Sequence, residues 1–147
     1  MTRAEVAERI LAAKQAKGLT FEAIARAVGR HKVWTTSALL GQATMSAEEA
    51  QKATAVLGLG PEVALALQQI PSKGSVGKDV PVDPLIYRFH EITQVYGTTL
   101  KAIIHEMFGD GIMSAIDFEM DIQRKEDPKG DRVVVTMNGK FLPYKKW

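Results

Sequence analysis

The sequence predicts an α+β protein with a helical N-terminal domain and a small C-terminal domain of helices and strands. Two observations support this prediction. Short helical patterns separated by glycines fill the first part of the chain, and the apolar–polar alternation typical of strands appears only towards the C-terminus. A stretch rich in proline and glycine, with neither periodicity, lies between them. We therefore divide the chain into residues 1–70, a linker at 71–83 and residues 84–147.

Composition excludes several classes of protein. The chain has 147 residues, a net charge of +2 and no cysteine. Without cysteine there are no disulfides, thiolate nucleophiles or cysteine zinc sites, and the nearly balanced charge disfavours a nucleic-acid-binding surface. The first residues interleave acids with bases, and no apolar run approaches the roughly 20 residues of a membrane span. We expect a cytoplasmic protein with no membrane or nucleic-acid partner.

Five short helices are expected in residues 1–70. Each has apolar side chains at helical spacing, so that one face is suited to packing on a core. The first four are expected to end at glycines, because glycine readily adopts the conformation that closes a helix. These glycines are Gly18, Gly29, Gly41 and Gly58.

Capping residues indicate where several of these helices begin. Thr20 is suited to cap the second helix, and Ser46 with Glu49 forms the capping-box pattern that opens the fourth. Pro61 suits the first position of the fifth helix, which we expect to end near Ile70. The result is a compact helical bundle.

A glycine turn between the second and third helices is typical of a helix-turn-helix domain. In a DNA-binding member, the third helix at about 31–40 would contact bases and phosphates. The basic cluster there is thin, and Trp34 in its middle is better suited to packing. We interpret the domain as a helix-turn-helix-like bundle without a DNA role, and keep a DNA-binding regulator as the alternative function. The candidate DNA-contacting residues are Arg30, His31, Lys32, Thr35 and Thr36.

Residues 71–83 are predicted to be a linker. Prolines flank a run rich in glycine, serine and lysine that has no periodicity. A phosphate-binding loop is the alternative, with Lys73 or Lys78 as its lysine. The glycine spacing of such a loop is absent, however, and a proline follows where a helix should begin.

Two helices are expected after the linker. Asp83 is a suitable N-cap and Pro84 suits the first helical position. Apolar side chains recur at helical spacing on both sides of Gly97, which we expect to end the first helix, so that Thr98 or the next threonine caps the second. Gly109 is expected to end the second helix.

Three short strands are predicted to complete the C-terminal domain. Residues 112–123 alternate, with Ile116 and the apolar residues after it on one face; residues 132–137 and 140–144 supply the others. Asn138-Gly139 is a strong two-residue hairpin signal between the last two. So small a sheet leaves its strand edges and one face open, so we expect it to pair with another copy of the chain.

Two charged residues and one serine are candidates for chemistry. Arg88 and Glu91 lie three residues apart at the edge of the apolar stripe of their helix, which suits either a surface ion pair or a functional pair. Ser114 by itself does not indicate a catalytic serine, because it lacks the Gly-x-Ser-x-Gly pattern of hydrolases. The histidines lack the spacing of a zinc-protease motif, so no metal site is expected. They are His31, His90 and His105.

The segment YRFHEITQVYGTTLKAIIHEMFGDGIMSAIDF carries a family resemblance. The words YRF, QVYGTTLKA, HE, FGDGI and SAI occur in the order found in the C-terminal domain of cyanases, and the similarity covers residues 84–118 and continues more weakly to Lys140. The family's catalytic arginine, glutamate and serine fall on Arg88, Glu91 and Ser114. His90 replaces an aromatic residue and Met107 a common lysine; neither belongs to that set.

The resemblance implies a reaction and an assembly. Cyanate and bicarbonate would give carbamate and carbon dioxide, and carbamate would decompose to ammonia and more carbon dioxide. Bicarbonate is the co-substrate, so no cofactor or metal is expected. Arg88 would bind an anion, Ser114 would stabilise developing charge, and Glu91 would either orient Arg88 or transfer a proton. Cyanases are homodecamers of five dimers, with intertwined dimer strands and active sites shared between chains.

Overall fold

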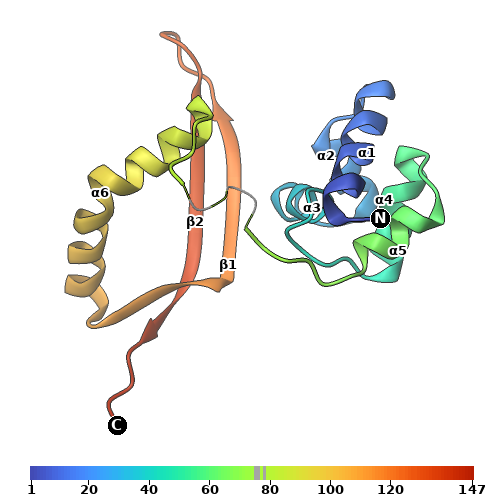
Figure 1. Cartoon of the computed structure of the whole chain (residues 1–147). Helices are drawn as coiled ribbons and strands as arrows, with labels where there is room; N and C mark the ends of the chain where they lie inside the picture. The colour runs from blue at the N-terminus through green and yellow to red at the C-terminus, as the bar shows by residue number, and fades with distance from the viewer. Residues whose placement is uncertain (75–76, 78) are drawn as a thin grey trace. The chain divides into compact units, whose positions relative to one another are not determined.

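The computed structural model describes residues 1–74, 77 and 79–147. Residues 75, 76 and 78 of the predicted linker, including Lys78 of the alternative phosphate loop, lie outside the described residues. The chain divides into two compact units, Met1–Ser75 and Val76–Trp147 (Figure 1). The described part contains six helices and one two-stranded antiparallel sheet, which confirms the α+β class. Within it, every helix is too short or too polar to cross a membrane.

Five helices form the first unit, as the sequence predicts (Figure 1). The predicted caps are present: Ala23 N–H donates to Thr20 Oγ1 over 3.0 Å, and Ser46 and Glu49 form a reciprocal capping box. The fifth helix ends at Leu67, a turn earlier than predicted. The helices are α1 (Arg3–Ala16), α2 (Phe21–Val28), α3 (Lys32–Leu39), α4 (Ala47–Leu57) and α5 (Pro61–Leu67).

This first unit has its own hydrophobic core. Apolar side chains from all five helices meet there, and large ones such as Ile10, Ile24 and Leu67 are fully buried. Arg3 ties the start of α1 to two other helix ends, because its guanidinium donates to the carbonyl oxygens of Ala66, at 2.8 Å, and Ala38, at 3.1 Å. Both carbonyls also accept a backbone N–H bond, from Gln69 and Gly41 respectively, so Arg3 adds a second donor at each helix end.

One long helix, α6 (Pro84–Phe108), replaces the two helices expected in the second unit. It begins as predicted, with the N–H groups of Leu85 and Ile86 donating to Asp83 Oδ1, both at 2.9 Å. The predicted break at Gly97 is wrong. Glycine inside a helix costs only about 1 kcal/mol relative to alanine, which a capped helix of 25 residues tolerates. The helix ends at Gly109, as expected.

The sheet has two long strands, β1 (Gly111–Lys125) and β2 (Arg132–Pro143), instead of three short ones. The hairpin predicted at Asn138-Gly139 is wrong, because these residues lie inside β2 and pair with Glu119 and Phe118 of β1. The chain turns earlier, at residues 126–131 between the two strands (Figure 1). The pairing along the whole ladder outweighs the local turn preference of two residues.

Helix α6 contacts the sheet near its C-terminal end. His105 Nε2 lies 3.3 Å from the carbonyl oxygen of Gly111, and the rings of Phe108 and Phe141 stack with centroids 5.0 Å apart. No residue of α6 is buried. The second unit therefore presents the apolar stripe of its helix to solvent, at Leu85, Phe89, Ile92, Tyr96, Leu100, Ile103 and Met107.

Candidate active site

Arg88 and Glu91 lie one turn apart near the start of α6. Arg88 Nη1 is 3.6 Å from Glu91 Oε2, and both side chains are largely exposed. An exposed pair of this kind contributes at most about 1 kcal/mol to stability. Because 3.6 Å exceeds hydrogen-bonding distance, the guanidinium keeps its N–H donors available for an anion. The guanidinium also lies over the ring of Tyr87, with its carbon 5.7 Å from the centroid.

Ser114 lies in a different environment, in a bulge of β1. Its residue is only 4% exposed, and its Oγ accepts hydrogen bonds from the N–H groups of Ile116 at 3.0 Å and Asp117 at 2.9 Å. A hydroxyl has two acceptor lone pairs and one proton. With both lone pairs engaged, Ser114 is left as a hydrogen-bond donor, the role that anion binding requires.

The bulge arises from an irregular register. Met113 pairs with Phe141 and Phe118 pairs with Gly139, so residues 114–117 of β1 face the single residue Lys140 of β2. The extra residues interrupt the alternation predicted for this strand. As a result Ile116, expected on the packed face, is 98% exposed.

A single chain brings together only two of the three predicted site residues. In the part of the chain that the structure describes, no hydrogen bond or ion pair links Ser114 to Arg88 or Glu91. Arg88 stands twenty residues before Phe108, which corresponds to about 30 Å of helix. Ser114 follows that far end of α6, on β1.

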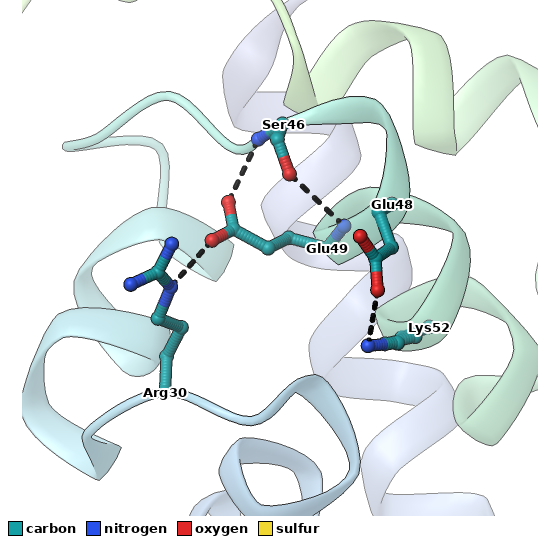
Figure 2. Close-up of polar contacts among 5 residues, drawn as sticks. All are labelled: Arg30, Ser46, Glu48, Glu49 and Lys52. Carbon is teal, nitrogen blue, oxygen red and sulfur yellow. Dashed lines mark hydrogen bonds and ion pairs between the residues drawn. The ribbon is translucent and has the colours of Figure 1, made fainter.

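Of the five residues considered for DNA contact, Arg30 and Thr35 are engaged within the first unit. Thr35 is fully buried and Trp34 packs against the core. Arg30 Nε donates to Glu49 Oε1 over 2.5 Å, as Figure 2 shows, and its guanidinium lies over the Trp34 ring. The middle of α3 is therefore committed to packing, as the sequence indicates for Trp34.

His90 and His105, both considered as possible metal ligands, contact different residues. The His90 ring lies beside that of Tyr87, with centroids 6.0 Å apart, while His105 contacts the carbonyl of Gly111. Among the described residues, no three His, Asp or Glu side chains are grouped so as to hold a metal ion.

Comparison with known proteins identifies the family. The model "Cyanate hydratase, N-terminal" matches residues 3–71, and "Cyanate lyase C-terminal domain" matches residues 78–146. A cyanate hydratase of Synechococcus sp. (strain CC9311) is 60% identical over 138 residues, covering 94% of this chain and 92% of that protein. The chain belongs to the cyanate hydratase family. The resemblance found in the sequence is thereby confirmed.

Further cyanate hydratases support this membership. That of Acaryochloris marina is 56% identical over the whole of both chains. The crystal structure of cyanase from T. urticae has a TM-score of 0.84 and 44% identity, and the match covers 94% of this chain and 96% of that one. The chain therefore shares its fold with a solved relative along nearly its full length.

Sequence reasoning missed the surroundings of Ser114. Neither the two backbone donors to its hydroxyl nor the close approach of Gly139 was predicted. The sequence carries no signal for either, because strand-like residues on both sides of Gly139 fit a hairpin and a continuous strand equally well.

Proposed function

We propose that this member of the family decomposes cyanate with bicarbonate as co-substrate. Cyanate, bicarbonate and one proton give carbamate and carbon dioxide; carbamate and a second proton then give ammonia and carbon dioxide. We propose cyanate as the substrate because the chain belongs to the cyanate hydratase family. The observation on this chain that best supports the chemistry is the donor-only hydroxyl of Ser114, with both of its lone pairs engaged by backbone N–H groups.

Both substrates are small anions, and two residues are suited to them. Arg88 offers a planar guanidinium that matches a pair of carboxylate-like oxygens, and its only ion pair among the described residues is the long one to Glu91. The Ser114 hydroxyl donates to the oxygen on which negative charge grows. Donors fixed in advance at such an oxygen typically contribute about 10²–10³-fold to a rate.

The first step joins the two anions. An oxygen of bicarbonate attacks the cyanate carbon, the new C–O bond forms, and the nitrogen takes up a proton. The C–O bond within the former bicarbonate then breaks, so that its carbon leaves as carbon dioxide and the transferred oxygen stays in carbamate. The nitrogen receives one proton from bicarbonate and one from outside. Bicarbonate supplies the nucleophile, and we propose that no metal or other cofactor takes part.

Two roles are open to Glu91. At 3.6 Å from Arg88 it is placed to orient the guanidinium, and as a carboxylic acid it could deliver the proton that the reaction consumes. Glu91→Gln separates these roles, because glutamine keeps the shape and a hydrogen-bond acceptor but carries no transferable proton. Partial activity in Glu91→Gln indicates orientation, whereas activity as low as that of Glu91→Ala indicates proton transfer.

The assembly proposed for this chain is a homodecamer of five dimers with intertwined strands and shared sites. Support comes from α6, none of whose residues is buried in the single chain. A lone two-stranded hairpin is also only marginally stable in water. The separate positions of Arg88 and Ser114 are what a site built from more than one chain requires. For the first unit we propose a helix-turn-helix-like topology without a DNA partner.

The test is an ammonia-release assay with cyanate, with and without bicarbonate. We expect release only when bicarbonate is present, unchanged after dialysis against EDTA. Arg88→Ala, Glu91→Ala and Ser114→Ala should each lose most activity while keeping the helical circular dichroism and oligomer size. Arg124→Ala is the matched control, since Arg124 also forms a long exposed ion pair, 3.8 Å from Asp131. Full activity in a site variant removes that residue from the mechanism, and the absence of any turnover in the wild type contradicts the proposal.

A further inference from the structure

Gly139 lies against the bulge that contains Ser114. It pairs with Phe118, the first residue after the bulge, while the four residues 114–117 face only Lys140. A Cβ atom placed on Gly139 would lie 2.5 Å from the carbonyl oxygen of Ser114 and 2.5 Å from Met113 Cγ. Real Cβ atoms do not approach other atoms so closely. The position therefore accepts only glycine without a shift of the neighbouring strand.

Space, and not backbone conformation, explains this glycine. Gly139 is not among the glycines with positive φ, such as Gly109 and Gly130, where other residues are strained. One of its two close neighbours is backbone, the Ser114 carbonyl, which cannot swing away as the end of a side chain can. A larger residue at 139 must therefore displace the peptide that follows Ser114.

Displacing that peptide disturbs the hydroxyl. The Ser114 carbonyl leads directly into the turn whose N–H groups, on Ile116 and Asp117, donate to Ser114 Oγ. These two bonds engage the lone pairs of the oxygen and leave its proton to donate. If the turn shifts, the hydroxyl loses both its fixed place and its assigned role as a donor.

We propose that Gly139 is a positioning residue for the reaction: its missing side chain lets the β1 bulge close over β2 and hold Ser114 as a fixed donor to the anionic substrate. This inference rests on the proposed function of Ser114. It also explains why a glycine stands within β2 at this position, although Asn138-Gly139 is a hairpin signal in the sequence.

The experiment compares two alanine variants of the full-length oligomer. Gly139→Ala is expected to lower kcat by about 10²-fold, the effect of misplacing a reacting group by about 1 Å, with little change in the KM for cyanate. Gly111→Ala is the matched control. Its Cβ would also clash within the same ladder, with the Leu142 carbonyl and the Phe141 ring, and none of its three nearest atoms belongs to Ser114. An equal loss of kcat in Gly111→Ala would show general damage to the sheet and overturn the inference.

Hydrogen–deuterium exchange supplies a readout that does not depend on activity. The amides of Ile116 and Asp117 should exchange faster in Gly139→Ala and in Ser114→Ala, and at the wild-type rate in Gly111→Ala. Wild-type exchange and wild-type kcat in Gly139→Ala would overturn the inference while leaving the proposed function intact. Full activity in Ser114→Ala would instead overturn the role of the serine itself.

A second variant serves if Gly139→Ala does not assemble. Adding Met113→Ala removes one of the two clashes and leaves the one with the Ser114 carbonyl. The double variant, compared with Met113→Ala alone, should show the same loss of kcat and the same faster exchange. Recovery of wild-type kcat in the double variant would mean that Gly139 acts through Met113 packing, and the inference would be wrong.

Discussion

The two units of this chain are stabilised in different ways. Every buried hydrophobic residue among those described belongs to the first unit, between Val6 and Leu67, where five helices close around one core. The second unit has a 25-residue helix with no buried residue and a two-stranded sheet. The first unit thus has its own core, whereas we propose that the second depends on association to cover its apolar surface.

The contrast extends to polar contacts. In the first unit, the Ser46–Glu49 capping box satisfies the start of α4, and Arg30 donates to the same Glu49 carboxylate (Figure 2). In the second, the charged pair Arg88–Glu91 is long and exposed, and Ser114 Oγ accepts its hydrogen bonds from the backbone of Ile116 and Asp117 in the same strand. The proposed catalytic residues therefore lie in the unit that has no buried hydrophobic core of its own in the single chain, which is why we propose that catalysis requires assembly.

The largest effect is expected from a charge on the apolar stripe of α6. Ile103→Asp should dissociate the oligomer and abolish cyanate turnover, because an unpaired carboxylate buried in an interface costs several kcal/mol. Sedimentation velocity measures the size. Gln94→Asp is the control, since residue 94 falls on the opposite face of the helix from Ile103, given 100° per residue. A fully assembled Ile103→Asp oligomer would mean that this stripe is not an interface.

A matched pair of leucine substitutions compares the two units directly. Leu57→Ala, at a site 1% exposed, should lower the free energy of unfolding by about 2–5 kcal/mol, by the same amount at every protein concentration. Leu85→Ala, at a site 69% exposed in the single chain, should lower stability by an amount that depends on concentration, because its partner is another subunit. Thermal unfolding across a hundredfold range of concentration makes the measurement. Concentration-independent loss at both sites would remove the distinction between the units.

The smallest effect concerns Glu49 at the start of α4. The N–H of Ser46 and the Arg30 guanidinium hold the pKa of the Glu49 carboxyl below its usual 4.5. A lowered pKa stabilises the fold at pH values above 4.5, and this contribution is lost as the pH falls through the folded-state value. Glu49→Gln should thus be less stable than wild type by about 1 kcal/mol at pH 7, with the difference vanishing in acid.

Thermal unfolding against pH checks this prediction, with Glu48→Gln as the control. Glu48 is the neighbouring carboxylate and pairs with Lys52 on the exposed side of the same helix. Its replacement should change stability less than that of Glu49, because exposed ion pairs are weak. A Glu49 effect that stays constant down to pH 3 would show that the charge of Glu49 is not what stabilises the cap.

Local signals in the sequence predicted local structure well. The caps at Thr20, Ser46 and Asp83 are present because each depends on a side chain and N–H groups two or three residues away. The same locality explains the failures. Gly97 and the Asn138-Gly139 pair favour a break and a turn by themselves, yet a long helix and a continuous ladder override them.

In the candidate site, too, the local feature could be predicted from the sequence and the long-range one could not. The pairing of Arg88 with Glu91 follows from their spacing on a helix and could be predicted. The environment of Ser114 could not, because its bulge is set by the register with a strand about twenty-five residues further on. Its relation to Arg88 in the proposed shared site could be predicted even less, since in that proposal it depends on contacts between chains.

The most direct test of the link between assembly and catalysis is subunit complementation. Arg88→Ala and Ser114→Ala chains, each inactive alone, are co-expressed with different affinity tags, and oligomers carrying both are purified and confirmed by mass spectrometry. If a site takes its arginine and serine from different chains, some sites in these mixed oligomers hold both wild-type residues, and cyanate-dependent ammonia release returns to a fraction of the wild-type rate. Confirmed mixed oligomers without any turnover would contradict the account, because each chain would then have to supply the complete set.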